Sequence, residues 1–444
     1  MTGAQYYRRA LDWRWLASFV MLLLLGTGIA YRQASFLMPD EGAHYLRAYE
    51  VSHLHLVNFR GTGGVDIPCN EYLVAAQKYN PIPVVQQKAI DGRLDPLCRV
   101  RSVNPAGAYS FVPYVPAAIA LRLTEKLKWQ VEDRLVAART ANFAVWFSIL
   151  FCGLLLINTG RMLMACLVLM PSFFWQLVAL SADGATFTFC LVYVFLVLHV
   201  IQQDKNITPK LLAVMVSTAA LIGASKGIYA PLSLLSFALW HRIAGTKLPY
   251  RIAVSIAPAV ASFGVFVVLA TVSDSTLIHI GNGANPALQV RYLMENPAFF
   301  SEVLYRAISN TDLLKLVAPT YAVPNEGRAF GIMLTTAVTV SGLLLFSGFG
   351  VNKKFRLLCA LLAIFQFASF CLPIYLTYTP VGAADIMGIQ GRYYLPIFPL
   401  LFIAVSINIE KIKQLMLLGP VAQKSGWLAF ISLLSLVVAY FNIK

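Results

Sequence analysis

Two adjacent carboxylates, Asp40 and Glu41, follow the first long apolar segment of the chain. That segment, 16–37, is long enough to cross a bilayer as a helix, and Arg8 and Arg9 lie on its other flank. Positive charge marks the cytoplasmic flank of a span, so we expect the acidic pair just outside the membrane on the opposite side. Carboxylates at this level lose hydration without adding to an apolar core. Their residue type suits the deprotonation of a hydroxyl group, which gives the first hypothesis of a chemical role.

The composition is that of a polytopic membrane protein. Of the 444 residues, 58% are hydrophobic and 12% are charged, with a mean hydropathy of +0.68, whereas soluble domains carry about 25% charged residues. The net charge of +15 does not indicate a nucleic-acid partner, because most basic residues fall in short loops between apolar segments, as insertion topology requires. We expect an all-α integral membrane protein that binds no nucleic acid.

Apolar segments of about 20 residues, the length of one helical span, predict about eleven transmembrane helices in a single membrane domain, 1–444. The candidates after the first are 134–157, 162–181, 184–202, 210–226, 229–241, 252–272, 329–349, 356–376, 393–409 and 427–442. From a cytoplasmic N-terminus, their alternation puts two long polar stretches outside, 38–132 with juxtamembrane helices and 273–328. We expect 107–123 to be a half-inserted helix on that face, because counting it as a span would reverse every later assignment. The cytoplasmic loops are too short for a nucleotide-binding fold, which disfavours ATP-driven transport and a nucleotide-sugar donor.

Cys69 and Cys98 both lie in the first polar stretch, whereas the other five cysteines fall in apolar segments. In an oxidising compartment the two could form a disulfide. Closing a loop of about 30 residues would stabilise it by roughly 3–4 kcal/mol on the chain-entropy model. The alternative is a pair of thiols.

Three polar side chains are expected at the external ends of later spans: Asp183, Lys226 and Arg392. Asp183 could instead be an N-cap, and Lys226 could simply extend to the interface. The two cations lie on the side that the positive-inside rule leaves poor in them, and a phosphate at headgroup level would satisfy both. Together with the carboxylates, they indicate transfer of a group from a lipid phosphate to an alcohol.

Further candidates flank these residues. His44 and Arg47 follow Asp40 at i+4 and i+7, which puts all three on one face if 40–57 is helical. His44 could be a structural histidine, and Arg47 could contact solvent or a lipid headgroup instead of substrate. Gln390 and Tyr393, beside Arg392, complete the candidate substrate contacts.

Four motifs, in order, resemble those of a bacterial multipass membrane family catalogued as a domain of unknown function. They are Pro39-Asp-Glu-Gly-Ala-His-Tyr-Leu-Arg-Ala-Tyr, Ser181-Ala-Asp-Gly, Ser225-Lys-Gly-Ile-Tyr-Ala-Pro-Leu and Gln390-Gly-Arg-Tyr-Tyr-Leu-Pro. The family is similar in layout to the GT-C glycosyltransferases, in which an acidic pair in the first external loop supplies the base and a polyprenyl-phosphate sugar is the donor. The resemblance implies a GT-C-like fold, the base role for Asp40 with Glu41 beside it, and phosphate contacts for Lys226 and Arg392.

The leading hypothesis is therefore an inverting glycosyltransferase in the bacterial inner membrane. It would move a monosaccharide from a polyprenyl-phosphate carrier to a surface glycan, such as O-antigen or a wall polymer, on the periplasmic side. Its partners would be the donor, the glycan acceptor and membrane lipid, and a divalent metal could organise the acidic pair. The alternatives are a flippase or exporter of a lipid-linked glycan, which needs the cations but not the pair, and a non-catalytic assembly subunit.

Overall fold

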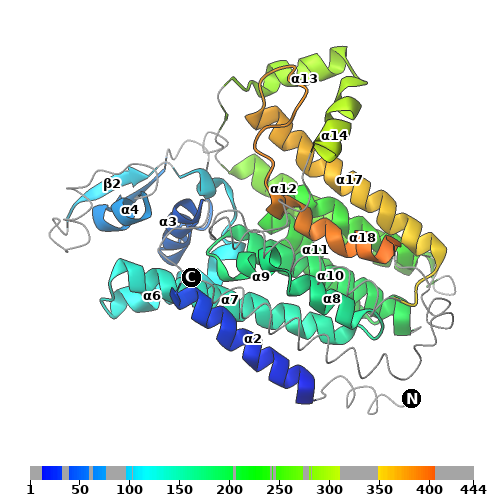
Figure 1. Cartoon of the computed structure of the whole chain (residues 1–444), viewed down its shortest axis with the longest axis horizontal. Helices are drawn as coiled ribbons and strands as arrows, with labels where there is room; N and C mark the ends of the chain where they lie inside the picture. The colour runs from blue at the N-terminus through cyan, green and yellow to red at the C-terminus, as the bar shows by residue number, and fades with distance from the viewer. Residues whose placement is uncertain are drawn as a thin grey trace.

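The computed structural model of this chain is dominated by helices (Figure 1). It describes residues 13–32, 40–59, 64–76, 97–102, 104–203, 207–240, 243, 247–273, 280–281, 283–310 and 349–405.

Apolar helices form the body of the protein. Five of those described are long and apolar enough to cross a membrane: α2 (Trp13–Arg32), α7 (Val131–Leu156), α10 (Ala182–Gln203), α12 (Leu248–Val272) and α17 (Lys353–Tyr378). The pair α8 (Arg161–Val168) and α9 (Pro171–Val178), bent by 65°, counts as a sixth if it is one span. Shorter apolar helices are α11 (Pro209–Ser225), η3 (Gly227–Leu239), and η5 (Gly391–Ile397) with α18 (Phe398–Val405).

These helical segments correspond in order to nine of the predicted spans. The candidate 427–442, and the candidate 329–349 apart from its last residue, lie outside the described residues, so the total of eleven stays a prediction. The remaining segments fail the length test for a simple span because α8 and α9 are separated by a bend and the others have fewer than 18 residues.

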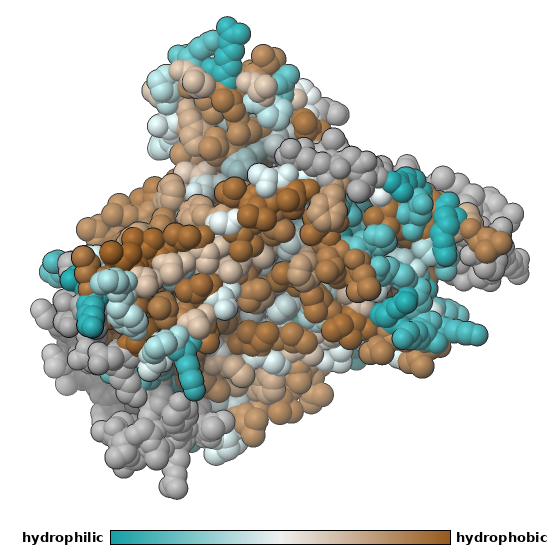
Figure 2. Space-filling model, turned by 180° about the vertical axis from the view of Figure 1, so that it is seen from behind, coloured by the Kyte–Doolittle hydropathy of each residue, from teal (hydrophilic) through white to brown (hydrophobic). Residues whose placement is uncertain are grey.

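The surface supports a membrane location for several of these helices. Figure 2 shows a broad hydrophobic area over the helical body, with hydrophilic residues gathered toward its ends. On α12, Val260, Val267 and Val268 are more than half exposed, and Leu361 and Ile364 on α17 are exposed to the same degree. Apolar areas of this kind mark contact with lipid or a partner. Together with the apolar helices, they make this a multi-pass membrane protein.

Of the five long apolar helices, α10 is the most buried; it is apolar on all sides, and its polar Thr186 and Thr188 have no exposed surface. A helix that is hydrophobic all round belongs inside a bundle. It carries Asp183 in its first turn and so holds that residue at a fixed depth. The chain then alternates in direction through α11, η3 and α12, which brings Ser225 and Ser273 to the same end of the bundle as Asp183.

The first polar stretch folds at this end of the bundle (Figure 1). Its elements are α3 (Glu41–Ser52), β1 (Val65–Pro68), α4 (Cys69–Ala76), β2 (Arg99–Ser102), η1 (Pro105–Ala108), η2 (Val112–Tyr114) and α6 (Val115–Lys126). The strands pair antiparallel, with Val65 opposite Ser102, so the all-α prediction omitted a two-stranded sheet. In place of the single half-inserted helix predicted over 107–123, the chain forms η2 and then α6, whose 12 residues are too few to span a bilayer.

The predicted disulfide is confirmed. Cys69 and Cys98 are bonded, with 5.4 Å between their Cα atoms, and their bond joins the first residue of α4 to the residue that precedes β2. In the second polar stretch, α13 (Pro286–Glu295) and α14 (Phe299–Ser309) are described, while 311–328 lies outside the described residues.

Candidate functional site

A cavity of about 930 Å³ lies between α3, η1 and the neighbouring ends of the apolar helices. One part of its wall is apolar and comes from two candidate spans, including Phe266 and Leu269 of α12 and Phe370 and Ile374 of α17. The polar part includes Asp40, His44, Lys226, Gln390, Arg392 and Tyr393. The cavity therefore combines a lipid-like wall with a charged end, and a volume within the range of small-molecule sites.

Four charged side chains form one network at the polar end. Arg392 donates to Asp40 at 2.7 Å, and Lys226 donates to Asp183 at 2.5 Å. The Arg392 Nε also lies 3.4 Å from the second carboxylate oxygen of Asp183. Two carboxylates and two cations from four distant parts of the chain thus meet, which confirms the expectation that these residues share one end of the bundle.

Asp40 occupies an unusual backbone position. It precedes α3 with φ of 63°, in the left-handed region, which Asp tolerates better than most residues. Its backbone carbonyl accepts from the His44 amide at 3.0 Å. Gly42, two residues on, packs against α4 so closely that a Cβ atom would lie 2.2 Å from the Ala75 carbonyl oxygen. The tight turn and this close approach fix the direction in which the Asp40 carboxylate leaves the backbone.

The Asp40 carboxylate is the most accessible member of the network, with 47% of its side chain exposed. Burial raises the pKa of this carboxyl, but the charge and hydrogen bond of Arg392 outweigh that effect and hold the pKa below its usual value. Asp40 is therefore ionised over the physiological range and can accept a proton.

The two cations are buried but retain donors for a ligand. Lys226 lies in an extended link between α11 and η3, 6% exposed, and its ammonium is 5.3 Å from the Tyr109 ring centroid and 5.6 Å from that of Tyr393. Arg392 has 9% of its side chain exposed, and its Nε has no hydrogen-bond partner among the described residues. Both side chains line the cavity, and a guanidinium beside an ammonium is suited to an anionic oxygen.

His44 reaches the same cavity as a neutral ring. Burial, with the positive charges of Lys226 and Arg392, lowers its pKa to about 3. Its Nδ1 is 2.7 Å from the Tyr114 hydroxyl, and its ring stacks against Tyr109. His44 thus adds a polar ring without a charge.

The family model described as "Predicted membrane protein (DUF2142)" matches residues 23–401. The chain belongs to this family. The match confirms the predicted resemblance to a multipass membrane family and covers the whole network. No curated protein and no solved structure matches the chain, so the likeness to GT-C enzymes stays a prediction.

In this DUF2142 protein the acidic pair is split. Glu41 has no exposed side-chain surface and accepts from Arg139 of α7 at 2.8 and 2.5 Å. It also accepts from the Leu180 backbone amide at 3.2 Å, and it does not line the cavity. Glu41 joins α3 to the bundle, so only Asp40 is carried forward as the candidate base.

Arg47 also departs from its predicted role. It shares a helix with His44, but it is fully buried and donates to the carbonyls of Tyr109, His55 and Leu56 and to Glu50. With its donors directed to these groups, it holds the end of α3 to the following loop. The helix ends at Ser52 rather than continuing to residue 57. Arg47 lies outside the cavity lining.

The residues present do not fit a metal site. Within the described ranges, no three His, Cys, Asp or Glu side chains are grouped as metal ligands. Asp40 and Asp183 both face cations, whose charge would repel a divalent ion. We therefore assign no chemical step to a metal.

Two residues that contact the predicted site residues were not assigned to the site from the sequence. Arg139 is a charge inside an apolar helix, which is a functional or pairing signal by itself. Tyr109 lies beside both Lys226 and His44. No sequence signal linked it to either residue.

Proposed function

We propose that this protein is an inverting glycosyltransferase that takes a monosaccharide from a polyprenyl-phosphate carrier and transfers it to a surface glycan. The observation that carries the proposal is the cavity itself, where Asp40, Lys226 and Arg392 meet beside the apolar wall of α12 and α17. A polyprenyl chain fits the apolar wall by its chemistry, and its phosphate fits the two cations.

The proposed reaction is a single displacement. Asp40 takes the proton of an acceptor hydroxyl as that oxygen attacks the anomeric carbon of the donor sugar. The bond from that carbon to the phosphate oxygen breaks, and its electron pair stays on the phosphate. Attack opposite the leaving group inverts the anomeric centre. Lys226 and Arg392 then stabilise the charge that grows on the leaving phosphate in the transition state.

The charge of the site is conserved in this scheme. Lys226 and Arg392 balance Asp40 and Asp183 before the donor arrives, and a phosphodiester adds one negative charge. When the phosphate gains its second negative charge, Asp40 becomes neutral by taking the acceptor proton. No net charge is created in a buried site, where it would be costly.

Donor binding also changes the base. In the structure Arg392 holds the Asp40 carboxylate at 2.7 Å, which lowers its pKa and weakens it as a base. A phosphate that draws Arg392 toward itself would raise the pKa of Asp40 and strengthen it only when the donor is present. This arrangement favours transfer over unproductive proton exchange.

The orientation belongs to the same proposal. Positive charge at the N-terminus and along the short loops supports a cytoplasmic N-terminus in a bacterial inner membrane, with the cavity on the periplasmic side. The acceptor would be an O-antigen or another envelope polymer.

The test uses purified protein and a synthetic short-chain polyprenyl-phosphate hexose, with acceptor glycan from the host envelope. Asp40→Asn keeps the size of the side chain but removes proton acceptance, so transfer should fall at least about 100-fold while donor binding persists. Asp133→Asn is the matched control, because Asp133 is exposed on α7 and does not line the cavity. If Asp40→Asn transfers at a near-normal rate, the mechanism is wrong, and export of a lipid-linked glycan becomes the better reading.

A further inference from the structure

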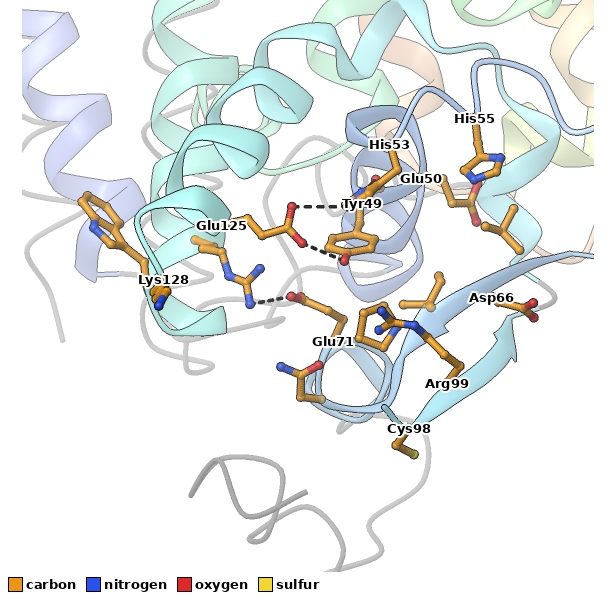
Figure 3. Close-up of a pocket in the computed structure, with 16 residues that line it drawn as sticks. Tyr49, Glu50, His53, His55, Asp66, Glu71, Cys98, Arg99, Glu125 and Lys128 are labelled. Carbon is orange, nitrogen blue, oxygen red and sulfur yellow. Dashed lines mark hydrogen bonds and ion pairs between the residues drawn. The ribbon is translucent and has the colours of Figure 1, made fainter. Parts of the chain in front are cut away.

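A second cavity, of about 460 Å³, lies between α3, α6 and the disulfide-bonded β1–α4–β2 unit (Figure 3). It shares no lining residue with the cavity that contains Asp40. Both cavities touch α3, the first at the start of the helix and the second at Tyr49, Glu50 and the following His53.

The wall of this cavity is a set of paired polar side chains. Glu71 accepts from Tyr45 at 2.6 Å and forms an ion pair with Arg134 at 2.5 Å. Figure 3 shows Glu125 directed to both Tyr49 and His53, at 3.1 and 3.3 Å. These mutual contacts hold donors and acceptors in fixed positions, as a preorganised site requires.

One buried donor in this wall is unused. Arg134 is 7% exposed, and its Nε has no hydrogen-bond partner among the described residues. A buried N–H without an acceptor costs free energy. The Arg134 Nη2 pairs with Glu71 at 2.5 Å, so Arg134 holds the Glu71 carboxylate in position in the cavity wall.

The remaining chemistry selects a neutral ligand rich in hydroxyl groups. Among the lining residues, carboxylates such as Asp66 and Glu125 are balanced by Arg99 and Lys128, so no strong net charge favours a simple cation or anion. Trp129 also lines the cavity and is 47% exposed, which leaves an aromatic surface for the apolar face of a ring. Mixed donors and acceptors beside an aromatic ring match a saccharide.

We propose that this second cavity is a saccharide-binding subsite that holds a distal sugar of the acceptor glycan. The proposal rests on the proposed glycosyltransferase function. Tyr49 is nine positions after Asp40, which at the helical rise is roughly 14 Å. An acceptor held here while its hydroxyl reaches Asp40 must therefore contain several sugar units, and a single monosaccharide would not bridge the two cavities.

The test measures binding rather than turnover. The probe is a set of size-fractionated oligosaccharides released by mild hydrolysis from the host envelope polysaccharide, titrated calorimetrically into Asp40→Asn protein to prevent transfer. We expect fractions of several units to bind more tightly than the monosaccharides. Trp129→Ala, made in the same background, should weaken binding roughly 2- to 12-fold, the scale of one aromatic contact. Trp13→Ala is the matched control, because Trp13 is 71% exposed and lines neither cavity.

A second variant separates loss of binding from loss of folding. Asp66 is 63% exposed, so Asp66→Ala should leave the thermal unfolding midpoint unchanged and weaken oligosaccharide binding in the same direction. The subsite is refuted if no fraction binds, or if Trp129→Ala and Asp66→Ala both bind as well as their parent. Oligosaccharide binding together with a wild-type protein that transfers no sugar from the donor would instead keep the subsite and refute the transferase, so the two failures are distinguishable.

Discussion

Glu41→Gln should destabilise the protein rather than remove its chemistry. The Glu41 carboxylate and the Arg139 guanidinium both have no exposed side-chain surface, and two hydrogen bonds of 2.8 and 2.5 Å join them. The substitution keeps the shape but leaves a buried guanidinium without its counter-charge. Removing one partner of such a pair costs about 3–5 kcal/mol of the free energy of unfolding.

Asp40→Asn should show the opposite pattern. Its side chain is 47% exposed, so its ion pair with Arg392 is partly screened by water, and the loss of stability should stay within about 1 kcal/mol. The two neighbouring carboxylates are therefore separated by two measurements, the thermal unfolding midpoint in detergent and the transfer rate per folded molecule. Glu41→Gln should lower the thermal unfolding midpoint, and Asp40→Asn should lower the transfer rate.

A double variant tests whether the buried charge is the cause. Glu41→Gln with Arg139→Gln removes both charges, so it should unfold at a higher temperature than Glu41→Gln alone, with a coupling of at least about 1 kcal/mol. Glu302→Gln is the surface control, because its pair with Arg306 is about half exposed and such pairs contribute about 0–1 kcal/mol. If Glu41→Gln unfolds like the wild type but loses transfer as severely as Asp40→Asn, the structural assignment of Glu41 is wrong.

Three further outcomes are expected. The pH profile of kcat/KM reports the free enzyme, and its acid limb should lie below pH 3.8, the ordinary pKa of Asp. The acid limb of kcat should lie at higher pH, because the bound phosphate competes for Arg392. Equal limbs would contradict the proposal that donor binding raises the pKa of Asp40. His44 has a pKa of about 3 in the folded protein and 6.5 when exposed. Its contribution to the free energy of unfolding should therefore be constant above pH 6.5 and fall toward pH 3, by up to about 1.4 kcal/mol per pH unit. Thermal unfolding midpoints measured across this pH range should depend less steeply on pH in His44→Asn than in the wild type. Peptide mapping without reduction should recover the Cys69 and Cys98 peptides linked, and Cys69→Ser should destabilise the loop by about 3–4 kcal/mol; recovery of both as alkylatable thiols would exclude the bond.

Much of the candidate site could be predicted because membrane topology constrains it. Apolar length identifies the helices, and alternation then assigns every helix end to one side or the other. That reasoning grouped Asp40, Asp183, Lys226 and Arg392 before any contact was known, and the structure brings them within hydrogen-bond or ion-pair distance. The disulfide was predictable for a similar reason, since both cysteines lie in the same polar stretch.

The error over Glu41 has a geometric cause. Side chains of adjacent helical residues project about 100° apart, so i and i+1 do not face the same neighbour. Asp40 enters the helix in the left-handed region, and its carboxylate lines the cavity while Glu41 meets Arg139 inside the bundle. Arg47 was misread for a different reason: periodicity does not reveal that loop carbonyls and Glu50 accept its donors.

By itself the sequence determined the class of protein, the order of its apolar segments and which polar residues share an end of the bundle. Whether a segment enters lipid as a helix depends on its own composition and length, and these can be read locally. Only the tertiary structure decided which of those residues form ion pairs, which join one helix to another and which line a cavity. Such pairings depend on contacts across long stretches of chain, as between Asp40 and Arg392, 352 positions apart. Local composition and periodicity carry no information about partners at that separation.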